Sequence, residues 1–202
     1  TDVKTSIDLF PEQNSYKVHG TYILVNKTKS AISEILINTS KEIIYNSIVS
    51  TELNLVEKDD EFGQHFFKTK QELLPNESIL VSFDFEYKIE PLIGHQRFNA
   101  IVENGAFMRI SRYFPTIGYN SDYEIEDKQE RERRGLPLPE ALTKVDEPLE
   151  NPYNYEFVNF DAVISTSADQ TAISIGELVN NYSKENRNYF HYQAKDVPFR
   201  FA

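Results

Sequence analysis

Apolar and polar residues alternate along much of this chain with a period of two residues. The clearest example is the segment 79–89, in which every odd position is apolar or aromatic and the even positions 82–88 are polar. Successive side chains of a β-strand point to opposite faces, whereas a helix would scatter the same residues around its circumference. The segment therefore predicts a strand that buries one of its two faces.

Further strands are predicted on both sides of this segment, separated by short polar turns. Positions 16–24 alternate in the same way, except that Gly20 interrupts the apolar face, which indicates a bulge or a close approach of another part of the chain. Similar but weaker patterns predict strands that begin at Ile35 and that cover 43–56, 64–74, 155–164, 172–175 and 189–192, with an acidic loop at 57–63.

One short helix is predicted between the earlier and the later strands. Ser121 and Glu124 have the spacing of a capping box, in which the two side chains satisfy free amide groups at a helix start. Two pairs of opposite charges stand four residues apart within 127–134, so they would meet on the helix surface. Gly135 and Pro137 are typical of a helix end. The segment predicts a short, charged and mostly solvated helix.

The order of these elements predicts an all-β fold, an antiparallel β-sandwich or saddle. The helix and a long proline-containing loop would form an insertion at about residues 116–153. The 202 residues fit one large sandwich domain, residues 1–202. The chain starts at Thr1 and ends in the apolar stretch 199–202, which resembles the beginning of another strand. We therefore expect a domain excised from a longer protein.

The net charge and the residue composition narrow the range of partners. A net charge of −11 disfavours nucleic acid and anionic lipid surfaces, which both attract Lys and Arg. Cysteine is absent from the sequence, which excludes disulfides and thiolate chemistry. No apolar run approaches the roughly 18 residues that cross a bilayer, so we expect no direct membrane insertion by this segment.

The sequence lacks the usual patterns of catalytic and metal sites. The four histidines, His19, His65, His95 and His191, are too far apart in sequence for the ligand spacing of zinc sites, and H-E-x-x-H is absent. A G-x-S-x-G elbow is also absent. We predict no catalytic residue, no metal site and no cofactor in this chain. Its many tyrosines leave open an independent glycan- or protein-binding sandwich, and a self-sufficient hydrolase is a third hypothesis.

A family resemblance is carried by the segment 103–119, ENGAFMRISRYFPTIGY. It predicts a strand with basic residues that ends at Phe-Pro before a turn at Gly118. The sequence Arg-Tyr-Phe-Pro at 112–115 resembles the Ala-Arg-x-x-Phe-Pro motif of the aminopeptidase N family of zinc aminopeptidases, the gluzincins. The chain resembles the N-terminal β-sandwich (saddle) domain of that family in further segments that occur in the same order, 16–25, 74–87, 155–176 and 190–199.

This resemblance implies a non-catalytic domain that forms one wall of a substrate cleft and docks on a downstream catalytic domain of the same polypeptide. The zinc-binding H-E-x-x-H helix and the zinc would belong to that downstream domain. The family places a Gln or Glu of the first domain near the free amine of the peptide substrate, about ten residues before Phe-Pro. The corresponding position in this sequence is Asn104.

The resemblance also carries an expectation about the cellular context. The motif variant at 111–119 and the charged helix at 127–131 resemble a divergent bacterial subgroup of the family. Its members carry the peptidase-like part beside transporter-permease-like membrane segments. We therefore expect a soluble domain of a bacterial membrane protein, on the periplasmic side.

Overall fold

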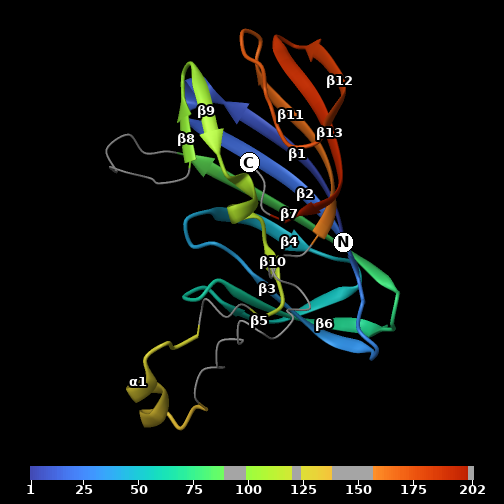
Figure 1. Ribbon diagram of the computed structural model, residues 1–202, viewed down its shortest axis with the longest axis vertical. Helices are drawn as coiled ribbons and strands as arrows, with labels where there is room; N and C mark the ends of the chain where they lie inside the picture. Colours follow the sequence, from blue (N-terminus) through green and yellow to red (C-terminus); the bar gives the residue numbers. More distant parts are fainter. Residues whose placement is uncertain (89–98, 120–123, 138–156, 200–202) are drawn as a thin grey trace, which may run out of the picture.

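The strands of this chain form two sheets and a separate hairpin (Figure 1). A computed structural model describes residues 1–88, 99–119, 124–137 and 157–199. The larger sheet has seven strands in the order β12-β13-β11-β1-β2-β7-β4, the smaller sheet has the order β10-β3-β6-β5, and β8 pairs with β9. The predicted all-β sandwich is thereby confirmed.

The element bounds are as follows. The strands are β1 (Asp2–Phe10), β2 (Ser15–Val25), β3 (Ile32–Asn38), β4 (Ile44–Val49), β5 (Leu53–Asp59), β6 (Gln64–Leu73), β7 (Ser78–Lys88), β8 (Asn99–Val102), β9 (Gly105–Met108), β10 (Thr116–Ile117), β11 (Phe157–Ser167), β12 (Glu177–Lys184) and β13 (Arg187–Pro198). One α-helix, α1 (Lys128–Arg133), and two 3-10 helices, Pro11–Gln13 and Ile110–Tyr113, complete the described part.

One strand pairing departs from the predicted antiparallel arrangement. β1 pairs antiparallel with β2 but parallel with β11, with Val3 opposite Phe160 and Ile7 opposite Ile164. Parallel strands need a long connection, and here residues 11–156 lie between the two. The larger sheet is therefore mixed, and its two sequence-distant strands meet at the centre.

Most predicted strands are confirmed, including the weaker ones at 64–74, 155–164 and 189–192, which overlap β6, β11 and β13. Two of the weaker predictions, 43–56 and 172–175, need correction. β2, β7 and β11 each bury alternate residues against the core. The segment 43–56 is two strands in different sheets, β4 and β5, separated by a turn in which the Glu52 N–H donates to Ser50 Oγ. The expected acidic loop at 57–63 begins later, because β5 continues to Asp59. The segment 172–175 is a loop, and the following residues form β12.

The helix begins later than the capping-box spacing predicts. Asp127 is its N-cap, and the carboxylate accepts a hydrogen bond from the Glu130 N–H at 2.7 Å. Asp127 therefore caps the helix and does not pair with Arg131, while Ser121 lies outside the described residues. The predicted pair of Glu130 with Arg134 is present at 2.8 Å. Arg131 is buried, with its guanidinium 2.8 Å from the Glu124 carboxylate, so this side of the helix is not solvated.

Aromatic rings fill the core on the inner face of the larger sheet. The Phe83 ring is fully buried and lies 4.8 Å from that of Tyr22 and 5.3 Å from that of Phe114, centroid to centroid. Gly20 stands opposite Phe83 in the β2–β7 register, and a Cβ atom at Gly20 would lie 2.1 Å from Phe83 Cζ. The interruption at Gly20 thus leaves room for a ring of the neighbouring strand.

Candidate functional site

Asn104 lies at the tip of the β8–β9 hairpin. Val102 pairs with Gly105, so Glu103 and Asn104 form a two-residue turn between the strands. The Asn104 side chain is exposed, and it has no hydrogen-bond partner among the residues that the structure describes. Its carboxamide therefore lies on the surface of the described part of the chain.

The Phe-Pro sequence that follows the hairpin is a core anchor. The residues before it form the 3-10 helix Ile110–Tyr113, not the continuous strand that the sequence predicts. The Phe114 ring is buried and lies 5.3 Å from the ring of Phe83 and 6.0 Å from that of Phe85. The hydroxyl of buried Tyr22 donates to the Pro115 carbonyl at 2.9 Å. These contacts fix the position at which the hairpin segment enters the core.

Removing the Tyr22 hydroxyl is expected to destabilise the protein. Burial, together with nearby Tyr45, raises the pKa of Tyr22 well above its ordinary value, so the hydroxyl stays a donor. Tyr22→Phe would leave the Pro115 carbonyl buried without this donor, which costs about 1–3 kcal/mol of the free energy of unfolding. Urea denaturation measures the change, and Tyr182→Phe on the exposed strand β12 is the control. Equal effects of the two substitutions would contradict this role.

A polar network joins the end of the 3-10 helix to the segment before β4. The Tyr113 hydroxyl donates to Glu42 at 3.0 Å, and Arg112 Nη2 lies 3.7 Å from the same carboxylate group. Burial, reinforced by Glu42, raises the pKa of Tyr113 to about 12. The Tyr45 hydroxyl donates to the Tyr113 carbonyl at 2.6 Å. Arg112, part of the family-like motif, thus contributes to a surface network.

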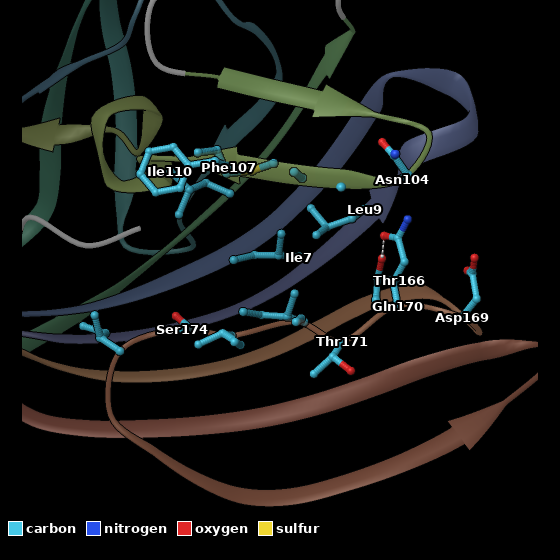
Figure 2. A pocket seen from close by; sticks show the side chains of 17 residues that line it. Ile7, Leu9, Asn104, Phe107, Ile110, Thr166, Asp169, Gln170, Thr171 and Ser174 are labelled. Atoms are coloured by element: carbon cyan, nitrogen blue, oxygen red, sulfur yellow. Dashed lines mark hydrogen bonds between the residues drawn. The ribbon is translucent and has the colours of Figure 1, made fainter.

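A cavity of about 680 Å³ opens beside the hairpin (Figure 2). Residues 104–108 form one wall, residues 169–175 form the other, and β1 and β11 supply the floor. Gln170 links the two walls, because its amide donates to the Glu103 carbonyl at 2.8 Å and its carbonyl accepts from the Thr166 hydroxyl at 3.0 Å. Asn104, the residue predicted from the sequence, therefore lies at the rim of a cavity.

None of the three described histidines lines this cavity. His19 Nδ1 lies 2.6 Å from Asp84 Oδ1, and His191 Nε2 lies 2.7 Å from Asp161 Oδ1. His65 is buried, and its burial followed by the charge of Lys58 lowers its pKa. His95 lies outside the described residues. Within the described ranges, no cluster of three or more His, Cys, Asp or Glu residues could hold a metal ion.

For the remaining cavity residues, the sequence predicts no role in a site. Asp169 and Gln170 belong to a loop whose sequence, Ser-Ala-Asp-Gln-Thr, is typical of a simple turn. Gln170 and Glu103 are separated by 67 positions in sequence. Their contact depends on the pairing of β1 with β11, and the sequence carries no local signal for that pairing.

The fold of this chain is also found in zinc peptidases. No protein-family model and no curated protein sequence matches the chain. Among solved structures, an M1 zinc metallopeptidase from Deinococcus radiodurans matches with a TM-score of 0.61 and 10% identity, over 98% of this chain and 39% of that chain. The shared feature is the fold.

Two further structures match over the same shares of the two chains. One is an M1 zinc metallopeptidase mutant from Deinococcus radiodurans bound to a Tyr-Ser-Ala substrate, with a TM-score of 0.53 and 11% identity. The other is a two-domain M1 zinc metallopeptidase mutant bound to L-arginine, with a TM-score of 0.55 and 10% identity. The chain thus spans about two fifths of the length of these metallopeptidases.

Proposed function

We propose that residues 1–202 are a single, non-catalytic N-terminal domain of a zinc aminopeptidase-like protein. The domain forms one wall of a peptide substrate cleft and docks on a downstream catalytic domain, which holds the zinc. The observation that carries this proposal is the match of 98% of this chain to only 39% of M1 zinc metallopeptidases, including a two-domain form. The cellular setting in the proposal is a bacterial membrane protein with this domain on the periplasmic side. No described helix is long and apolar enough to cross a membrane.

The first experiment tests whether catalysis requires the part of the protein that lies outside this chain. The isolated chain and the full-length protein are assayed with aminoacyl reporter substrates, with and without a zinc chelator. We expect turnover by the full-length protein alone, and loss of that turnover with the chelator. Zinc-dependent turnover by the isolated chain would favour the self-sufficient hydrolase, and an inactive full-length protein without a zinc motif would overturn the proposal.

Within this proposal, Asn104 binds the free amine of the peptide substrate. Its exposed amide carbonyl accepts a hydrogen bond from the ammonium group, in a position where the family uses Gln or Glu. A hydrogen bond to a charged group contributes about 1.5–3 kcal/mol. Asn104→Ala in the full-length protein is therefore expected to raise KM about tenfold or more, and Asn104→Gln to restore part of the loss. An unchanged KM and kcat for Asn104→Ala would remove this role.

The alternative of a glycan-binding module has less support from the described surface. Sugar rings stack on exposed aromatic faces, and the strand pair β12–β13 carries Tyr182 and Tyr189. These two rings stack on each other, with centroids 4.9 Å apart and planes at 2°. Each ring therefore covers one face of the other, as expected for ordinary cross-strand packing.

A further inference from the structure

The cavity beside the hairpin has the form of a slot between two segments of chain. One wall is the consecutive stretch 104–108, which contains β9, and the other is the consecutive stretch 169–175. Both walls run the length of the cavity, from the end near Asn104 and Asp169 to the end near Ile110 and Ser174 (Figure 2). The floor is mainly apolar, because Ile7, Leu9 and Ile164 of β1 and β11 line it.

The wall formed by β9 is a strand edge with no partner among the described strands. Among the described strands, β9 pairs only with β8, and β9 rather than β8 lines the slot. In a hairpin with a two-residue turn, the pair that flanks the turn exchanges hydrogen bonds, which here is Val102 with Gly105. Because hydrogen-bonded and non-hydrogen-bonded pairs alternate, the N–H and C=O groups of Ala106 and Met108 point away from β8.

This geometry favours an extended peptide over a compact ligand. An unpaired edge is a template for another strand, which gains affinity from main-chain hydrogen bonds and specificity from its alternate side chains. β9 has four residues, so it can pair with about four residues of a bound strand. The apolar floor would receive the side chains on one face of that strand.

The charge of the slot defines the chemistry of the bound segment further. Among the described residues that line the slot, Asp169 is the only charged one, and it lies at the same end as Asn104. It is exposed and has no ion-pair partner among the described residues. The neighbouring Gln170 side chain is already engaged by Thr166 and Glu103. A Lys or Arg side chain at this end would therefore find an available carboxylate.

We propose that the slot binds an extended peptide of another polypeptide as a third strand beside β9. The peptide runs antiparallel to β9, which gives the better hydrogen-bond geometry, so its C-terminal end lies beside Asp169. It carries apolar side chains at alternate positions, directed to the floor, and a basic residue at the C-terminal end. This site lies within the chain itself and does not depend on the proposed docking role or on the role of Asn104.

A labelled peptide tests the proposal on the isolated chain. The probe is fluorescein-Thr-Val-Thr-Val-Thr-Lys-amide, and fluorescence anisotropy is followed as the protein is titrated to about 1 mM. Two further probes carry backbone N-methyl groups within the central segment Val-Thr-Val-Thr. One is methylated at its two Val nitrogens, and the other at its two Thr nitrogens. Because only alternate N–H groups of a third strand face β9, one methylated probe is expected to bind at least tenfold more weakly than the other.

Protein variants and spectra complete the test. A probe with Glu in place of Lys is expected to bind several-fold more weakly, and Asp169→Asn should remove that preference without affecting the fold, because Asp169 is exposed. In NMR spectra, the amide chemical-shift changes on peptide binding should centre on Ala106 and Met108.

Four results would overturn the proposal: absence of saturable binding, equal binding of the two methylated probes, chemical-shift changes elsewhere in the chain, or self-association of the chain that blocks the probe.

Discussion

Phe114→Ala is expected to lower the free energy of unfolding by about 3–5 kcal/mol, as measured by urea or thermal denaturation. The ring is 2% exposed and packs between Phe83 and Phe85 of β7 and Phe199 near the end of the described chain. Alanine would leave a cavity that these large rings cannot fill without moving. The energetic effect comes from both the lost burial and that cavity.

Phe107→Ala is the matched control for this substitution. Phe107 lies in the same segment, on β9, but it is 73% exposed, so its removal should change the stability by no more than about 0.5 kcal/mol. Similar losses for the two variants would contradict the view that Phe-Pro anchors the hairpin segment in the core. The family-like motif would then need an explanation other than packing.

The strands with the clearest alternation were predictable from the sequence, whereas the central strand β1 and the edge strand β12 were not. Burial alternates along most of β2 and along all of β7, because each strand presents one side to the aromatic core and the other to solvent. β12 is exposed at all eight positions, so burial imposes no alternation on it. Its place in the sheet comes from pairing with β13, as in the Tyr182–Tyr189 stack, and not from its own pattern.

The loop before β12 illustrates the opposite error. Its residues 172–175 are partly apolar and read as a strand, but Ala172 is held by a hydrogen bond from the Tyr192 hydroxyl to its carbonyl at 3.0 Å. Gly176 then turns the chain with a positive φ of 91°. An apolar loop that lines a cavity can have the same composition as a strand, and only its contacts in the folded chain distinguish the loop from a strand.

The candidate site was predictable only at one residue. Asn104 was identified by its distance in sequence from Phe-Pro, and the structure places it in an exposed turn at the rim of the slot. The opposite wall and the floor come from residues of β1, β11 and the loop after β11, which are brought together by the parallel pairing. A pairing between two strands so far apart in the sequence leaves no recognisable pattern in either strand alone.

The pair Gly20 and Phe83 should show strong energetic coupling. Phe83→Ala alone is expected to cost about 3–5 kcal/mol, because its fully buried ring is surrounded by other rings. Gly20→Ala alone is expected to cost about 1–3 kcal/mol, since the new methyl group would lie 2.1 Å from a ring atom that has no space to retreat. In the double variant the ring is absent, so the added methyl group no longer clashes.

A double-mutant cycle measured by urea denaturation isolates this interaction. We expect the double variant to be more stable than the sum of the single changes predicts, by about 0.5–3 kcal/mol, and Gly20→Ala to be nearly neutral once Phe83 is Ala. Gly105→Ala is the control, because a Cβ atom there would meet nothing within 4 Å. Strict additivity of the two substitutions would contradict the view that Gly20 makes room for the Phe83 ring. A coupled result would assign Gly20 to the close approach of the Phe83 ring, which joins β2 to the core that carries Phe114.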